Sequence, residues 1–177
     1  MNARVVFTLA ALLLAAPAFA QTKGRLNLPE FAALADKASE TVTVTMDSNL
    51  LGFAARFLSS EDPEQAKAKK LASSLTGIYV QHFTFETDYA YPKADIESVR
   101  RQLNAPGWSR IVEARSKKEN TNVDVFLLVS GDKVQGLAVI ASEPREFTIV
   151  NIVGSIDVDK IGRLEGQFGI PQLSQNQ

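Results

Sequence analysis

His82 is the only histidine in the chain, and it is the residue whose chemistry best suits a general base. It lies in a strand-like stretch from Ile78 to Thr87, where alternation puts it on the same side as Glu86. Pairing with Glu86 or with a distant serine would give a hydrolase, but no G-x-S-x-G motif accompanies it. A partly exposed strand histidine is the favoured interpretation, and a hydrolase that uses His82 is the second alternative.

Metal and cofactor chemistry finds little support in the other residues. The absence of cysteine excludes disulfides, thiolate zinc sites, iron–sulfur ligation and thiol nucleophiles. Asp157 and Asp159 are spaced like the start of a calcium loop, but the required glycine and distal glutamate are missing, so Asp157 is predicted to cap a helix. We therefore predict no catalytic residue, no metal site and no cofactor. Two close carboxylate pairs are predicted to be solvated: Glu86 with Asp88, and Asp95 with Glu97.

Charge and composition exclude other classes of function. The 177 residues include 19 Lys and Arg against 20 Asp and Glu, so the formal net charge is −1. Such a balance gives no electrostatic footprint for nucleic acid. With 45% hydrophobic residues the chain has ordinary globular composition rather than that of a disordered protein.

Residues 1–20 have the pattern of an export signal. Arg4 precedes an apolar run over residues 5–16, Pro17 ends that run, and Ala18-Phe19-Ala20 fits an A-x-A cleavage site. A helix over the run would be ~18 Å long, against ~30 Å of hydrocarbon in a bilayer. The sequence predicts a protein exported by a cleaved signal peptide to the periplasm or secreted, with no transmembrane segment in residues 21–177.

The elements that would position any site follow in the order α-β-α-α-β-α-β-β-β-β-α. After a polar lead-in at 21–27, a single domain is predicted over 28–171, followed by a loose tail at 172–177. Short links between the late strands predict antiparallel neighbours, and so an α+β fold with a mainly antiparallel sheet packed with helices. The expected helices cover 28–38, 49–59, 63–76, 93–103 and 157–168, and the expected strands cover 41–46, 78–87, 108–114, 123–130, 133–142 and 146–154.

The late strands are apolar on both faces, which predicts that both faces are covered. Each large apolar side chain left in water would forfeit ~1.5–3 kcal/mol. The cover could come from the five helices or from a second subunit. Asn151 stands between Ile149 and Val153 in a strand that should be central, so its amide should be hydrogen-bonded or line a small cavity.

The helix expected at 49–59 is the most apolar of the chain, and its apolar residues spread over more than one face. Such a helix is buried, or it meets a partner or a membrane surface. The leading hypothesis is a non-enzymatic binding module that meets another envelope protein or itself. The alternative is a carrier of a small apolar ligand between sheet and helices. The candidate partner or ligand surface comprises Leu50, Phe53, Phe57, Phe83, Phe85 and Trp108, of which the five aromatic residues would line the carrier's pocket.

Four stretches of the chain resemble a known family. They are residues 107–112, the strand that ends in Ala138-Val139-Ile140, and residues 147–157, together with the closing residues from Leu164 to Pro171. The chain is similar here to the bacterial family called domain of unknown function 4252 (DUF4252), over about residues 25–171. The resemblance implies a small exported one-domain protein. Some members are lipid-anchored through a cysteine that this chain lacks, and the resemblance implies no activity or catalytic residue.

Overall fold

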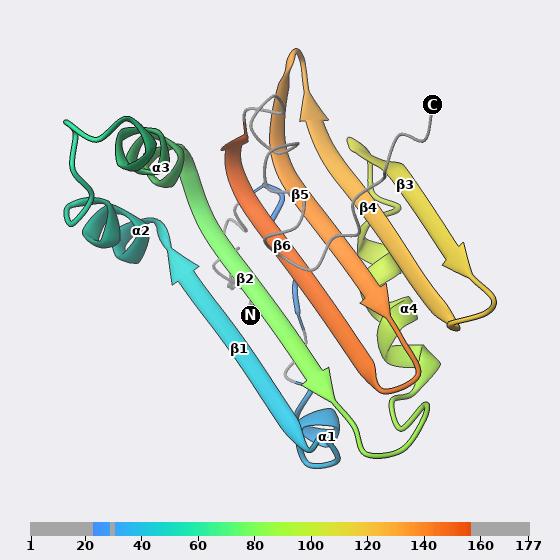
Figure 1. Cartoon of the computed structure of the whole chain (residues 1–177). Helices are drawn as coiled ribbons and strands as arrows, with labels where there is room; N and C mark the ends of the chain where they lie inside the picture. Colours follow the sequence, from blue (N-terminus) through green and yellow to red (C-terminus); the bar gives the residue numbers. More distant parts are fainter. Residues whose placement is uncertain (1–22, 29–30, 157–177) are drawn as a thin grey trace, which may run out of the picture.

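A six-stranded antiparallel sheet forms the body of the protein, with the strand order β1-β2-β6-β5-β4-β3 (Figure 1). The computed structural model describes residues 23–28 and 31–156; the predicted signal segment 1–20, the helix expected at 157–168 and the tail 172–177 lie outside these residues. The predicted α+β class is confirmed. The elements are α1 (Ala32–Ala35), β1 (Glu40–Asp47), α2 (Ser48–Ala55), α3 (Pro63–Ser74), β2 (Leu75–Thr84), α4 (Lys93–Gln102), β3 (Trp108–Ser116), β4 (Thr121–Ser130), β5 (Lys133–Ser142) and β6 (Glu146–Ile156).

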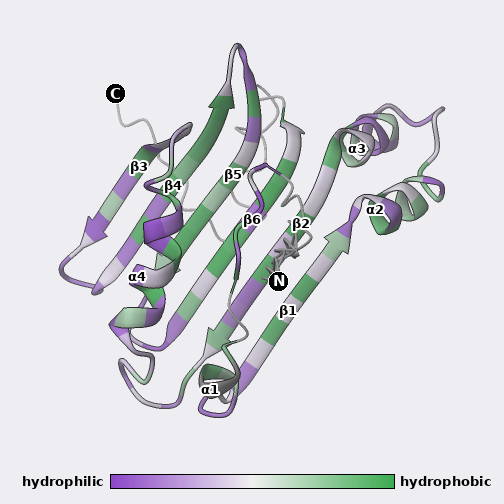
Figure 2. Cartoon of the chain, turned by 180° about the vertical axis from the view of Figure 1, so that it is seen from behind, coloured by the Kyte–Doolittle hydropathy of each residue, from purple (hydrophilic) through white to green (hydrophobic). Residues whose placement is uncertain are grey.

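The first face of the sheet packs against α1, α4 and the N-terminal residues (Figure 2). Phe83 and Phe147 on neighbouring strands stack with their ring centroids 6.4 Å apart, and Phe31 meets both rings edge-on. Val99 and Leu103 of α4 are buried in the same cluster. Alternating apolar residues on four strands therefore build one core with the two helices.

Asn151 holds residues 24–26 against this first face by hydrogen bonds. Its side chain is fully buried and accepts a hydrogen bond from the Leu26 N–H at 2.9 Å. Its amide nitrogen donates to the carbonyl oxygens of Gly24 at 3.0 Å and Leu137 at 3.3 Å. The predicted hydrogen bonding of Asn151 is confirmed, and its partners are backbone groups rather than other side chains.

The first helix is shorter than the sequence predicts, since α1 covers only Ala32–Ala35 instead of 28–38. The N–H of Asn27 bonds to the side-chain oxygen of Gln102, and the Gln102 amide donates to the Asn27 carbonyl, both at 2.8 Å. The backbone of Asn27 is therefore bonded to α4. Together with the Asn151 contacts, these bonds fix residues 24–27 against the sheet in a non-helical form.

Strand β2 begins earlier than expected, at Leu75, because Leu75 pairs with Gly154 of β6. The predicted helix end at Gly77 is therefore wrong: α3 ends at Ser74, and Gly77 lies in the strand. A Cβ atom at Gly77 would lie 2.5 Å from the Tyr79 hydroxyl oxygen. Gly77 thus leaves the space that the Tyr79 side chain occupies on the same face of the strand.

The second face of the sheet carries a separate apolar core, to which α2 and α3 contribute at one end of the strands (Figure 1). Leu51 of α2 packs there with Leu75 and with Met46 and Ile78 of the first two strands. Both faces of the late strands are apolar, and each face carries one of the two core clusters. Farther from these helices, six half-buried valines on six strands lie next to one another in register, and we call them the valine row: Val44, Val80, Val150, Val139, Val125 and Val112.

Candidate interaction surface

The candidate surface begins with the way in which the chain enters α2. The Asp47 carboxylate at the end of β1 accepts hydrogen bonds from the N–H groups of Asn49 and Leu50, both at 2.9 Å. This is the N-cap arrangement that a short acidic side chain provides at a helix start. It turns the chain directly from an edge strand into a helix at the end of the sheet.

The helix α2 buries one side and exposes the other. Leu51 and Ala55 are buried against the second core, whereas Leu50, Phe53 and Phe57 remain 51%, 57% and 74% exposed. These three side chains, which we call the anchor surface, follow the spacing i, i+3, i+7 of a single helical stripe. Large exposed apolar side chains gathered on one short segment are unusual on a folded domain, which makes this stripe a candidate interaction surface.

Phe57 keeps its place on this stripe although α2 ends at Ala55. The N–H groups of Arg56, Phe57 and Leu58 bond to carbonyl oxygens three residues earlier, at 3.1, 3.2 and 3.3 Å. These bonds continue the helical turn past the last α-helical residue. The rings of Phe53 and Phe57 then meet edge-to-face, with centroids 5.1 Å apart and planes at 76°.

Residues 58–60, which follow the anchor surface, are hydrogen-bonded to α3. The Ser59 N–H bonds to the Gln65 side chain at 2.9 Å, and the Lys69 ammonium reaches the Leu58 carbonyl at 3.3 Å and the Ser60 hydroxyl at 3.1 Å. At the start of α3, the N–H groups of residues 64 and 65 bond to Asp62, and these bonds hold the pKa of that carboxyl below its usual value. The anchor surface is thus carried by a helical pair with defined internal contacts.

The other three residues of the predicted surface lie elsewhere. Phe83 and Phe85 are buried in the first core, on the face of the sheet opposite to α2, and Trp108 is half-buried at the start of β3. The grouping of six residues into one surface is therefore wrong, and the five aromatic residues do not line a common pocket. Alternation along β2 indicated that Phe83 and Phe85 share a face, but it could not indicate which helices cover that face.

A hollow with a mainly polar lining lies beside residues 25–28. It measures about 430 Å³ and lies between residues 25–28 and strands β1 and β2. Thr43, Thr45 and Gln81 line it, and the Gln81 side-chain oxygen is buried without a hydrogen-bond partner among the described residues. The guanidinium of Arg25 lies 4.5 Å from the centroid of the Tyr79 ring at the same place. Water or a small polar molecule suits these groups better than an apolar ligand.

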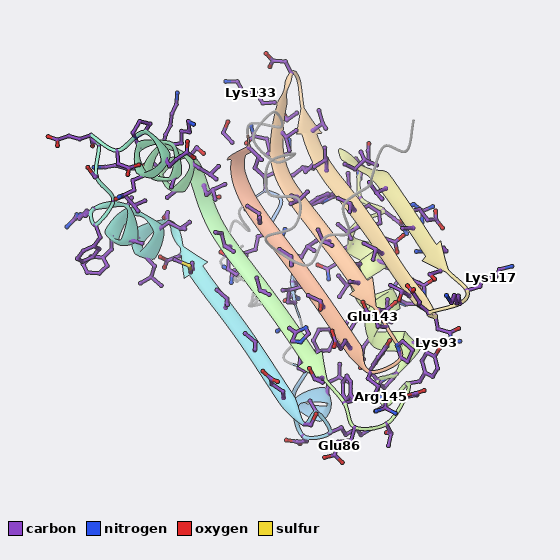
Figure 3. All side chains as sticks on the ribbon, in the orientation of Figure 1. Glu86, Lys93, Lys117, Lys133, Glu143 and Arg145 are labelled. Carbon is purple, nitrogen blue, oxygen red and sulfur yellow. The ribbon has the colours of Figure 1, made fainter. Side chains whose placement is uncertain are left out.

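His82 has hydroxyl partners within the described part of the chain. Its Nδ1 lies 2.8 Å from the Thr148 hydroxyl and its Nε2 lies 3.2 Å from the Thr84 hydroxyl. Glu86 is exposed in the loop beyond β2, at the end of the sheet (Figure 3). A hydrolytic site needs a group that orients the imidazole and a hydroxyl that is activated by it. Both ring nitrogens of His82 are already engaged by strand threonines on its own face of the sheet.

Sequence reasoning missed the largest cluster of paired charges among the described residues, which surrounds Asp124 in β4. This carboxylate is fully buried and lies 2.7 Å from Arg100 of α4, 3.0 Å from Arg115 and 3.5 Å from Arg110 of β3. Glu97 pairs with Arg100, and Glu113 of β3 pairs with Arg110 and Arg115. An aspartate between valines in a central strand was the signal that could have indicated a buried ion pair.

The charges of this cluster are balanced and engaged with one another. Burial alone would lower the pKa of Arg100, but the hydrogen bonds and charges of Glu97 and Asp124 outweigh it, and the pKa is raised. The cluster therefore fastens α4 and β3 to the middle of β4. Among the residues that the structure describes, no group of three or more histidine, aspartate or glutamate side chains is placed to hold a metal ion. No described helix has the length and apolar character needed to cross a membrane.

Comparison with known proteins gives one match. The model of the family described as "Domain of unknown function (DUF4252)" matches residues 35–164. That range includes the anchor surface, all six strands and the residues directly after β6. No curated protein and no solved structure matches the chain. The chain belongs to the DUF4252 family.

Proposed function

We propose that this protein is a non-enzymatic binding module that inserts its anchor surface into an apolar groove of a partner protein in the cell envelope. The observation that carries the proposal is the exposure of Leu50, Phe53 and Phe57 on one stripe of α2. Helices that dock into grooves use anchors at these spacings. The export predicted from residues 1–20 supports an envelope partner.

The exposed area of the anchors makes the proposal energetically reasonable. A fully buried Leu or Phe side chain gains ~1.5–3 kcal/mol, and between half and three quarters of each anchor is exposed before binding. Burial of all three therefore contributes about 3–5 kcal/mol. Since association itself costs at least ~4 kcal/mol, the groove must add further contacts around the anchors. The bonds of Ser59 and Lys69 lower the cost of ordering this segment, because they hold it in place beforehand.

The charges around the anchors favour a protein groove over an anionic membrane. The stretch from Asp47 to Leu75 holds four basic residues and four acidic ones. Interfacial helices that bind anionic lipids combine an apolar face with a basic one. Here the acidic residues offset the lysines of α3, and one of those lysines, Lys67, is paired with Glu64 at 2.6 Å. A groove with mixed charges at its rim fits this surface better.

Site-specific photo-crosslinking tests the proposal in the cell that makes the protein. A photoreactive phenylalanine analogue at Phe57 should give a defined adduct with one envelope protein. The purified adduct partner should then bind the isolated module, and Phe53→Ser and Phe57→Ser should each weaken that binding about tenfold or more, as is usual for hot-spot anchors. Ala54→Ser, which also lies on the exposed side of α2, is the matched control and should bind normally.

Three outcomes would contradict the proposal. Equal binding by the serine variants and the wild type would show that the anchors do not carry recognition. Binding of the module to vesicles with anionic lipid, lost in Phe57→Ser, would identify a membrane as the target. A stable dimer that dissociates in Phe57→Ser would identify a second copy as the occupant.

A further inference from the structure

Two adjoining hollows lie between the start of α4, the loop before it and the turn that joins β3 to β4. They measure about 390 and 380 Å³, which is in the range of sites for small organic molecules. Three polar side chains from the first face line the larger hollow, and they are cross-strand neighbours on β3, β4 and β5: Arg115, Asn122 and Ser142. We call the two hollows together the polar recess, and the residues that line both of them are Tyr89, Lys93, Arg115, Asn120 and Asn122.

The polar recess carries an excess of positive charge. Its described lining includes one acidic residue, Glu97, and four basic ones: Lys93, Arg100, Arg115 and Lys117. The two arginines pair with Glu97 and Asp124, whereas the two lysines form no ion pair within the described part of the chain. Lys93 and Lys117 lie at the same end of the sheet (Figure 3). Their two ammonium groups therefore remain available for an anion.

Left-handed backbone is concentrated around the polar recess. Tyr89 and Asn120 are the two described residues other than glycine with this conformation, at φ values of 57° and 53°. Both of them line both hollows. Asparagine adopts the left-handed conformation readily, but for a bulky residue such as tyrosine it is a strained outlier. Strain of this kind persists mainly at sites that bind a ligand or carry out chemistry, which makes Tyr89 a candidate binding residue.

The turn between β5 and β6 holds Tyr89 in place. The Tyr89 N–H donates to the Pro144 carbonyl oxygen at 2.6 Å, and the neighbouring Asp88 pairs with Arg145 at 2.7 Å. The Tyr89 side chain nevertheless has 55% of its surface exposed. The polar recess thus includes an aromatic ring that is open to solvent on a backbone that is already fixed.

We propose that the polar recess binds a sugar that carries an acidic group, either a carboxylate or a phosphate. The two lysines pair with the acidic group. The side chains of Asn120, Asn122 and Ser142 offer donors and acceptors for the sugar hydroxyl groups, and the exposed Tyr89 ring suits the apolar face of a sugar ring. A bare anion would use the lysines alone. The recess is distinct from the anchor surface, so the inference does not depend on the proposed function.

An NMR titration of the isotope-labelled full chain tests the site with four named probes. Glucuronic acid and glucose 6-phosphate represent the carboxylate and the phosphate, and glucose and inorganic phosphate are the controls. At least one of the two acidic sugars should shift the backbone amide signals of Tyr89, Asn120 and Asn122 at concentrations up to about 10 mM. Its Kd should be about tenfold or more below the values for both controls.

Variants of the lining residues provide the second measurement. Lys93→Gln combined with Lys117→Gln should weaken binding about tenfold or more, because the acidic group loses both of its ammonium partners. Lys133→Gln is the matched control and should bind normally, since Lys133 lies at the opposite end of β5 from Ser142 (Figure 3). Tyr89→Gly removes the ring but adopts the left-handed backbone without strain, so it should weaken binding and leave the fold intact. Circular dichroism verifies that each variant is folded.

Each of the remaining outcomes would overturn the proposal. If neither acidic sugar shifts the signals of the polar recess at about 10 mM, the recess is not a site for this class of ligand. Equal affinity for inorganic phosphate would identify an adventitious anion only, and equal affinity for glucose would show that the lysines do not contribute. Unchanged binding by a folded Tyr89→Gly protein would remove the reason to assign a sugar ring to the recess.

Discussion

Replacement of Asn151 by alanine should be among the most destabilising single changes in the described part of the protein. The fully buried side chain makes three hydrogen bonds, to Leu26 at 2.9 Å, Gly24 at 3.0 Å and Leu137 at 3.3 Å. All three partners are backbone groups. Alanine would remove these three bonds and would open a small cavity at the centre of β6.

The expected loss of stability follows from these contacts. Each buried polar group left without a partner costs ~1–3 kcal/mol. Residues 24–26 can move away from the sheet, so that their backbone groups bond to water. The protein then loses the burial of Leu26 instead, which costs ~1.5–3 kcal/mol. The bond to the Leu137 carbonyl in β5 is lost in addition. We expect Asn151→Ala to lower the free energy of unfolding by about 3–5 kcal/mol.

The variant Asn151→Asp distinguishes lost hydrogen bonds from lost volume. Its ionised carboxylate could still accept from Leu26, but it would face two carbonyl oxygens and could not donate to them. Burial of the charge would raise the folded-state pKa of this carboxyl above ~3.9, the value of the unfolded chain. The penalty is therefore absent at pH below ~3.9 and grows as the pH rises through and above that value, so Asn151→Asp should approach the wild type only in acid.

Urea unfolding followed by circular dichroism measures both effects, at neutral pH and near pH 4. Asn122→Ala in β4 is the matched control, because Asn122 is only partly buried, and its change should cost less than ~1 kcal/mol. A loss below ~1 kcal/mol for Asn151→Ala would refute the reasoning. If the loss of stability in Asn151→Asp does not depend on pH, the burial of a charged carboxylate opposite two carbonyl oxygens is not its cause.

Three further changes test other contacts of the fold. Asp124→Ala removes the shared partner of the arginine cluster and should lower the free energy of unfolding by about 3 kcal/mol in urea, whereas a change below ~1 kcal/mol would show that the cluster is solvated. Burial raises the pKa of Tyr91 from 10.0 to about 12, and the charges of Tyr89 and Glu143 add to the shift. The free energy of unfolding should therefore fall as the pH rises from about 10 to about 12. Tyr91→Phe should make this fall smaller in urea titrations at alkaline pH. Gly77→Ala should displace the Tyr79 ring and lower the melting temperature, and an unchanged melting temperature would show that the ring moves aside without cost.

The sequence predicted best those features that depend on local pattern. Alternation and short links predicted the four late strands and their antiparallel pairing, and the position of Asn151 between apolar neighbours predicted its hydrogen bonding. The start of the helix expected at 63–76 agrees to the residue with α3, which begins at Pro63 after the N-cap Asp62. In each case the physical cause lies within a few residues of the element, so the pattern contains it.

Features that depend on distant partners could not be predicted in this way. The apolar helix at 49–59 looked suited to burial as well as to exposure, and only the placement of α2 at the end of the sheet exposes Phe53 and Phe57. The partners of Asp124 come from α4 and from β3, which no spacing in the sequence links to it. The non-helical path of residues 24–27 depends on Asn151 and Gln102, which lie far along the chain.

The order of the strands also bears on where self-assembly into fibrils would begin. Strand β3 forms one border of the described sheet, and it carries a bulge between Arg110 and Val112 and several charged side chains, both of which discourage pairing with another chain. Strand β1 forms the other border, pairs with β2 in unbroken register, and is composed mainly of threonine and valine. Among the described residues no strand pairs with the outer edge of β1, so aggregation would start on this backbone, and a lysine at Thr43 should delay it.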